Sequence, residues 1–175
     1  MKLSVREICK FSMMGTLMYI SKAVMEFLPN VHLIAAFIAV FTIVYRAKAL
    51  FPIYVFVFLT GLMNGFNTWW IPYLYIWAVL WGALMLLPKS IPNKIKPFVY
   101  MGICALHGLL YGTLYAPFQA LFYGLSIKGM IAWIVAGLPW DAVHAAGNLV
   151  TGALIIPLSK LLENIEKRFQ TGKDI

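Results

Sequence analysis

Charged residues are scarce in this 175-residue sequence, and acidic ones are the scarcest, with six Asp and Glu against fourteen Lys and Arg. Only 11% of the residues are charged and 62% are hydrophobic. Soluble domains have roughly 25% charged and 45–50% apolar residues. Because a chain of this length cannot hide so much apolar surface from water, the composition excludes an ordinary soluble domain and predicts a single membrane-embedded unit.

Several motifs of enzymes are also missing. The sequence contains no G-x-x-x-x-G-K-[ST] phosphate loop, no Gly-rich dinucleotide fingerprint and no H-E-x-x-H zinc motif. Its two cysteines, Cys9 and Cys104, have no metal or redox spacing. The first apolar stretch contains Lys22 and Glu26 and no small-residue cleavage site, so no cleaved signal peptide is expected. We expect no ATP site, metal or cofactor in this chain, and no nucleic-acid partner.

The sequence does contain six apolar segments, and a helix of about 20 residues crosses a bilayer. The segments cover residues 9–28, 31–45, 49–65, 69–87, 98–117 and 139–159. Residues 118–138 are read as an outer loop with an apolar helical piece, ending at a break near Gly137 and Pro139. The prediction is an all-α membrane protein, with one domain over 1–175 and six transmembrane helices.

Basic residues fall on one side of this arrangement. Only Lys22 and Lys128 depart from the pattern. The other twelve of the fourteen precede the first segment, follow the sixth, or lie in the turns after the second and fourth: Lys2, Arg6, Lys10, Arg46, Lys48, Lys89, Lys94, Lys96, Lys160, Lys167, Arg168 and Lys173. Cytoplasmic loops are rich in Lys and Arg, so both termini are expected in the cytoplasm.

Polar side chains gather near the outer ends of the predicted helices. The first helix runs outward, which places Lys22 about 18 Å and Glu26 about 24 Å along one face. The sixth helix runs inward, and Asp141, His144 and Asn148 share a face in its outer half. An ionisable group in hydrocarbon costs at least about 2.5–3.5 kcal/mol, so these groups are expected to line a cavity that opens outward.

Aromatic side chains reach the same depth from the fourth segment, where Trp69, Tyr73, Trp77 and Trp81 are spaced by four and form one stripe. Rings stack on flat heterocycles, while carboxylates, amides and imidazoles pair with their edges. The predicted ligand contacts are Glu26, Asn30, Trp70, Tyr73, Asp141, His144 and Asn148, with Lys22, His32, Asn64, Trp77 and His107 as further candidates. Glu26 and Asp141 would accept hydrogen bonds, Trp70 and Tyr73 would stack, and His144 and Asn148 would complete the polar floor.

Each group also has a purely structural interpretation. The outer Trp and Tyr residues could form an interfacial belt, and the deeper ones could be packing residues. Lys22 and Glu26 could be an ion pair, and the polar side chains from Asp141 onward could form an interhelical network. A packing role is favoured for His107. The coincidence of so many polar groups at one depth is what favours a binding site.

Three local patterns resemble one family of transporters. They are Ser21-Lys22 through Phe27-Leu28-Pro29-Asn30 with His32-Leu33, Trp69-Trp70-Ile71 with Tyr73 and Tyr75, and Pro139-Trp140-Asp141 with His144 and Gly147-Asn148. Together with the size, six-helix layout and basic turns of nearly the whole chain, they resemble the substrate-specific (S) component of energy-coupling factor (ECF) transporters.

The resemblance implies a non-enzymatic subunit in the bacterial plasma membrane that captures a vitamin from outside. It would dock on a membrane coupling (T) protein carrying two cytoplasmic ATPases, whose ATP-driven motion topples it and releases the ligand inside. Many S components dock through an Ala-x-x-x-Ala patch, and Ser12, Gly15 and Thr16 occupy that place here. Metal-importing members carry His at position 2, where this chain has Lys2, so metal import is not expected.

Two other classes of function stay open from the sequence. A small intramembrane enzyme could use Asp141 and His144 as acid and base or as metal ligands, and an accessory subunit would bind no ligand at all. Among ligands, thiamine precursors, folates, flavins, queuosine precursors and corrinoids all have aromatic faces and hydrogen-bonding edges. The volume of the cavity would separate the small ligands from the corrinoids.

Overall fold

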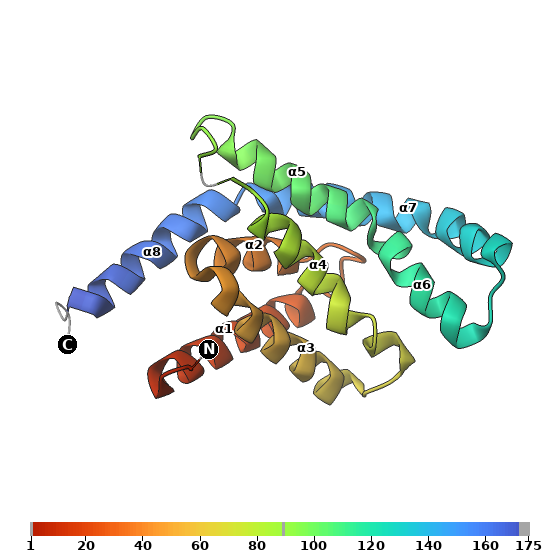
Figure 1. The fold of residues 1–175 in the computed structure, drawn as a ribbon, viewed down its shortest axis with the longest axis horizontal. Helices are drawn as coiled ribbons and strands as arrows, with labels where there is room; N and C mark the ends of the chain where they lie inside the picture. Colours follow the sequence, from red (N-terminus) through yellow and green to blue (C-terminus); the bar gives the residue numbers. More distant parts are fainter. Residues whose placement is uncertain (1, 89, 172–175) are drawn as a thin grey trace.

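The computed structural model describes residues 2–88 and 90–171, and every regular element in that part of the chain is helical. Lys89 and Lys173, two of the basic residues used to predict the orientation, lie outside the described residues. The elements are α1 (Val5–Val24), α2 (Ile34–Tyr45), the 3-10 helix η1 (Arg46–Ala49), α3 (Leu50–Asn64), the 3-10 helix η2 (Thr68–Trp70), α4 (Tyr73–Met85), α5 (Lys96–Leu109), α6 (Tyr111–Tyr123), α7 (Ile127–Gly152) and α8 (Ile155–Thr171) (Figure 1).

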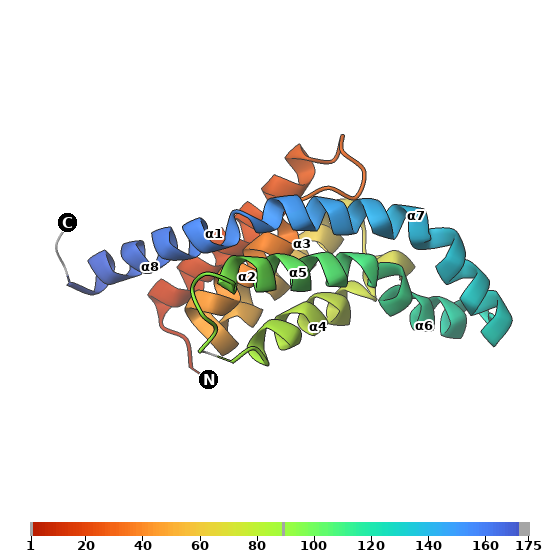
Figure 2. The same cartoon turned by 90° about the horizontal axis from the view of Figure 1, so that it is seen from above.

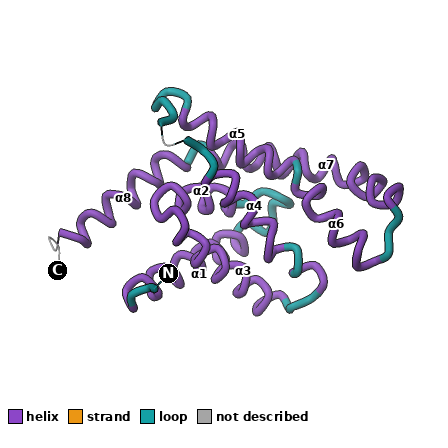
Figure 3. Tube along the Cα trace, in the orientation of Figure 1, coloured by secondary structure: helices purple, strands orange, loops and turns teal. Residues whose placement is uncertain are grey.

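The helices pack in pairs that are distant in sequence. α5 lies along α7, and α1 lies along α3 (Figures 1 and 2). α2 contacts α4 and α8, while α6 packs against the first part of α7. The chain bends by 48° between α7 and α8, and α8 then reaches back to the start of α1. Figure 3 shows the loops between these helices, of which those linking α1 to α2 and α4 to α5 are the longest.

Two helical stretches, Ile34–Asn64 and Lys96–Tyr123, are long and apolar enough to cross a membrane. The α7–α8 pair is a third candidate if its two bent parts count as one span. If α5 is joined to α6 and α7 to α8, the described part of the chain forms six helical units. Their order is that of the six predicted segments, and α1 to α4 begin and end within a few residues of the first four.

The stretch 34–64 turns back on itself at η1. The rings of His32, just before α2, and Phe56, in α3, have their centroids 6.1 and 6.0 Å from that of Trp77. The two rings are therefore no more than about 12 Å apart, whereas one straight helix would separate them by about 36 Å. Arg46 leaves the helical conformation with φ +53°, so the reversal coincides with the basic turn expected after the second segment.

The prediction of an outer loop over 118–138 is corrected by the structure. α6 continues to Tyr123, and α7 begins at Ile127 and runs through Pro139 without a break. The turn itself is short, because Gly124 takes the left-handed conformation that ends α6 and the Ser126 hydroxyl accepts from the Gly129 N–H to cap α7. Pro139 is itself exposed, while α5 and α6 both pack against α7.

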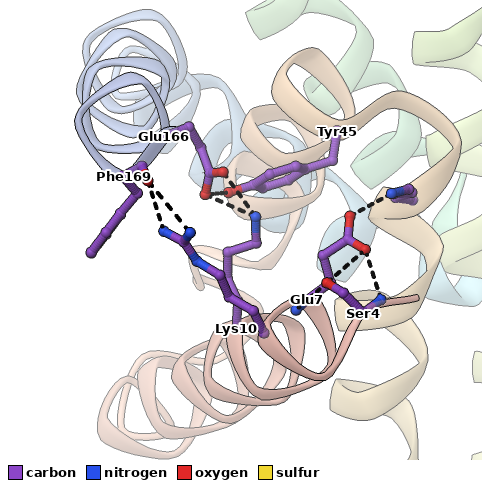
Figure 4. A network of polar contacts seen from close by, with 8 residues as sticks. Ser4, Glu7, Lys10, Tyr45, Glu166 and Phe169 are labelled. Carbon is purple, nitrogen blue, oxygen red and sulfur yellow. Dashed lines mark hydrogen bonds and ion pairs between the residues drawn. The ribbon is translucent and has the colours of Figure 1, made fainter. Parts of the chain in front are cut away.

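Polar contacts fasten α1, α2 and α8 together where the two ends of the described chain meet (Figure 4). The Lys10 Nζ atom lies 2.9 Å from both carboxylate oxygens of Glu166, and the Tyr45 hydroxyl donates to the same carboxylate at 2.7 Å. The Arg6 guanidinium donates to the Phe169 carbonyl oxygen. We call this side of the molecule the terminal end.

A capping box begins α1 at the terminal end. The Ser4 hydroxyl accepts from the Glu7 N–H, and the Glu7 carboxylate accepts from the Ser4 N–H at 3.0 Å. The other Glu7 oxygen pairs with the Lys48 ammonium, which comes from the η1 turn. The hydrogen bond from Lys48 and the bond from the Ser4 backbone lower the pKa of the Glu7 carboxyl from 4.5 to about 2.

This lowered pKa predicts a specific pH response. Since the folded protein holds Glu7 ionised, its contribution to stability is complete above pH 4.5 and is lost as the pH falls towards 2. Carboxyl-resolved NMR of the detergent-solubilised protein should show Glu7 titrating near 2, and Lys48→Met should move the midpoint back towards 4.5. A midpoint that does not respond to Lys48→Met would contradict the pairing.

Candidate functional site

A cavity of about 260 Å³ lies between the loop that links α1 to α2, the start of α4, the start of α6 and the middle of α7. Six residues predicted from the sequence line it: Lys22, Glu26, Asn30, His32, Tyr73 and His144. Its remaining walls are Met25, Leu28, Pro29, Val31 and Tyr111. Side chains from four separate segments of the chain therefore meet in one chamber, as their common depth predicted.

The floor of the cavity is a cluster of aromatic and imidazole rings around Trp77. Its centroid lies 5.5 Å from that of Tyr73, 5.8 Å from that of Tyr111 and 5.8 Å from that of His107. The stripe predicted along the fourth segment is present at its N-terminal end, because Tyr73 contacts both Trp69 and Trp77 edge to face. His144 joins the cluster from α7, with its ring 4.9 Å from those of His32 and Tyr111.

Buried nitrogen atoms in this cluster have no hydrogen-bond partner among the described residues. They are Nε1 of Trp77, Nδ1 of His32, Nδ1 of His107 and Nε2 of His144. An unpaired buried polar group costs about 1–3 kcal/mol, so a folded protein keeps few of them. Their concentration at one cavity is expected of a binding site whose ligand supplies the missing partners.

Two predicted contacts on α7 are directed at neighbouring helices instead. Both carboxylate oxygens of Asp141 accept from the Gly112 N–H, at 3.1 Å, just beyond the joint between α5 and α6. The Asn148 side-chain amide donates to the Cys104 carbonyl oxygen at 3.0 Å. Neither residue lines the cavity, so these two side chains match the interhelical network that the sequence left open as an alternative.

Trp70 and Asn64 also lie away from the cavity. The Trp70 indole donates to the Val57 carbonyl oxygen at 2.8 Å, which fixes the start of α4 against α3. Asn64, the last residue of α3, accepts from the Tyr19 hydroxyl at 3.2 Å and is exposed. Trp77 and His107 occupy an intermediate position, because they lie beneath the cavity and contact residues that line it.

The prediction that Lys22 and Glu26 share one helical face is wrong. The α1 helix ends at Val24, with Met25 as its cap, so Glu26 lies beyond the helix and does not share a face with Lys22. Among the described residues no ion pair joins the two, although both line the cavity. The chain leaves the helix here to form the rim, where Asn30 has the positive φ of a turn residue.

The residues predicted to dock a partner fall on two faces of α1. Gly15 is buried against α3, where an added Cβ would lie 2.5 Å from Val55 Cγ1 and 2.8 Å from the Pro52 oxygen. Its role is therefore close packing of α1 on α3, and it is not available to a partner. Ser12 and Thr16 lie on a neighbouring, exposed face, where they line an apolar groove of about 830 Å³ between α1 and α8.

Tyr111 is the aromatic lining residue that the sequence reasoning missed. It follows His107 by four residues, so both lie on one helical face, and that spacing was available as a signal. Tyr111 was not considered as a site residue, because residues 98–117 were read as one helix in which His107 was a packing residue. In the structure its ring contacts Trp77, His107 and His144 at once.

Metal ligands do not converge in the described residues, where no group of three His, Cys, Asp or Glu side chains could hold an ion. Asp141 and His144, the pair considered for acid–base or metal chemistry, share α7 but only His144 reaches the cavity. The arrangement can therefore stack and hydrogen-bond a ring. No protein-family model, curated protein or solved structure matches this chain.

Proposed function

We propose that this chain is a multi-pass protein of the bacterial plasma membrane that captures a vitamin or a related nitrogen heterocycle from outside. It would cross the membrane six times with both termini in the cytoplasm. In this proposal it is the substrate-binding subunit of an ECF-type importer, and a membrane coupling protein with two ATPases would supply the energy. The chain itself performs no catalysis.

The observation that carries the proposal is the ring-lined cavity with unpaired nitrogens at its floor. Aromatic and imidazole rings offer faces for stacking a heterocycle, and buried nitrogens offer directed pairing to its edges. Glu26 and Asn30 stand at the rim, where they can reach polar substituents. A protein that only packed helices together would gain nothing from leaving His144 Nε2 without a partner.

Charge supports the orientation that uptake requires. The terminal end carries Arg6, Lys10 and Lys48, and the cavity is formed by the loop at the other end of α1. Since basic residues favour the cytoplasmic side, the cavity would open outward. The apolar groove beside Ser12 and Thr16 would remain available at the membrane-facing side of α1 for the coupling protein.

The size of the cavity restricts the ligand. Pockets for drug-sized molecules measure about 300–1,000 Å³, and this one measures about 260 Å³. A ligand with one or two rings, such as a thiamine precursor, suits this volume better than a corrinoid does. Tyr73, Tyr111 and His144 surround the space and limit how far it can widen.

Small-molecule release from the purified protein tests the proposal. We expect mass spectrometry to find a heterocycle that co-purifies with the chain or rebinds from a mixture of thiamine precursors, folates and flavins. Glu26→Ala should weaken that binding, whereas Glu163→Ala, a matched change on exposed α8, should leave it unchanged. A wild-type protein that retains nothing and rebinds nothing would overturn the proposal.

A further inference from the structure

Two buried nitrogens beneath the cavity have opposite hydrogen-bonding requirements. Trp77 Nε1 carries a hydrogen and can only donate. His107 Nε2 lies 3.1 Å from the Ile76 carbonyl oxygen, which can only accept, so Nε2 carries the ring hydrogen. In the neutral ring Nδ1 is then left as an acceptor. One donor and one acceptor therefore stand unpaired on neighbouring rings, whose centroids are 5.8 Å apart.

Aromatic and imidazole side chains surround this pair of nitrogen atoms. Trp77 is 1% exposed and His107 is 5% exposed. The other rings around Trp77 belong to His32, Phe56, Tyr73 and Tyr111, and none of these side chains is an acid or a strong base. A carboxylate or phosphate buried there would lose its hydration without gaining a counter-ion, so the group that reaches the pair has to be uncharged.

Building on the binding function proposed above, we propose that the ligand enters ring first and that an uncharged edge with a neighbouring donor and acceptor pairs with Trp77 and His107. A lactam or an aminated N-heterocycle has such an edge. The ligand's acceptor atom would accept a hydrogen bond from Trp77 Nε1–H, and the ligand's N–H would donate one to His107 Nδ1. Charged substituents would then stay at the rim, beside Lys22 and Glu26.

The floor of the cavity has to open slightly for this contact. The rings of His32, Tyr73 and Tyr111 line the cavity and also contact Trp77, so the pair lies one ring below the space. His32 belongs to the loop before α2, and its Nδ1 makes no hydrogen bond that would hold the ring in place. Rotation of the His32 ring is the simplest way to extend the cavity towards Trp77 and His107.

The test compares 2-pyridone, which has an N–H beside a carbonyl, with N-methyl-2-pyridone, which lacks the donor. Titration calorimetry on the full-length protein in detergent should detect 2-pyridone and show about tenfold weaker binding, or none, for the methylated probe. Trp77→Phe, which keeps a ring, and His107→Gln, which keeps a donor for the Ile76 oxygen, should each weaken 2-pyridone by a similar factor.

Trp81→Phe is the matched control, because the Trp81 indole donates to the Arg46 oxygen at the other end of α4. It should leave 2-pyridone binding unchanged and lower the unfolding temperature of the ligand-free protein. Trp77→Phe also removes part of a buried ring and should lower that temperature through lost packing, so the affinity for 2-pyridone is the readout that decides the pairing.

The remaining outcomes separate the two proposals. Equal binding of both probes, unchanged affinity in both variants, or a protein that binds a vitamin but not 2-pyridone would overturn the pairing and leave the capture function standing. A wild-type protein that binds neither 2-pyridone nor any vitamin of the mixture would overturn both.

Discussion

Replacing Tyr111 by alanine should lower the affinity for the captured heterocycle by roughly 30-fold, which corresponds to about 2 kcal/mol. Tyr111 lines the cavity and its ring contacts Trp77, His107 and His144, so its loss removes a stacking wall and loosens the floor. Titration calorimetry with the molecule identified by mass spectrometry measures the change.

Tyr115→Ala provides the matched control, one helical turn further along α6. The Tyr115 hydroxyl donates to the Trp69 oxygen and its ring stacks on Trp133, outside the cavity. This variant should lose some stability but keep its affinity within about threefold, or 0.7 kcal/mol. Equal losses of affinity in Tyr111→Ala and Tyr115→Ala would show that the two act only through folding and would remove the cavity from the account.

Substitution of Gly15 by alanine should destabilise the fold by about 1–3 kcal/mol, an effect on packing rather than on partner binding. The new methyl group would lie 2.5 Å from Val55 Cγ1 and 2.8 Å from the Pro52 oxygen. The Pro52 oxygen is a backbone atom and cannot move aside as a side chain can, so α1 and α3 would have to separate along their length. Thermal unfolding of the detergent-solubilised protein would report the loss.

Gly102→Ala is the corresponding change at an open position. An added Cβ on Gly102, in α5, meets nothing within 4 Å, and alanine favours a helix over glycine by about 1 kcal/mol. The variant should be as stable as the wild type or more stable. If Gly15→Ala kept full stability but abolished transport with the coupling proteins, the interpretation of Gly15 as a packing residue would be contradicted.

Apolar runs and turn residues predicted the helices well where the turns are polar. The basic residues at 46 and 48 lie at a real helix boundary, and the proline and asparagine after the first segment lie in a real loop, although α1 already ends at Val24. The later segments could not be divided correctly, because residues 96–152 are apolar almost throughout. The joint at Leu110 has no polar marker, and α7 runs on through Pro139, the residue that predicted a break.

The position of each polar residue along its predicted helix identified about half of the residues that line the cavity. His144 lies at the depth that the rise per residue along its helix predicts, whereas Glu26 and Asn30 reach the same chamber from the loop beyond α1. Position along a helix could not say which neighbour each polar face meets. Asp141 shares a face with His144, yet its carboxylate meets a backbone N–H where α6 approaches closely through a glycine.

The small residues at that approach explain why sequence alone was insufficient. An added Cβ at Gly108 would lie 2.8 Å from the Asn148 amide, and one at Gly112 would lie 2.5 Å from Asp141 Oδ2. These glycines let α5 and α6 pack close enough to α7 for the Asp141 carboxylate to accept from the Gly112 N–H and for the Asn148 amide N–H to donate to the Cys104 oxygen. Such contacts depend on which helices, distant in sequence, pack together. The periodicity of residues along one helix does not predict that pairing.

Cysteine accessibility at Asn30 tests most directly whether the polar-lined chamber opens to the outside. Asn30 is an exposed rim residue of the cavity, native Cys9 is exposed on α1, and Cys104 is buried. On intact cells a membrane-impermeant maleimide should label Asn30→Cys, and the captured heterocycle should protect it. Cys9 should react only after permeabilisation. Labelling of Cys9 but not of Asn30→Cys on intact cells, or labelling that no ligand affects, would contradict an outward-facing chamber that binds the ligand.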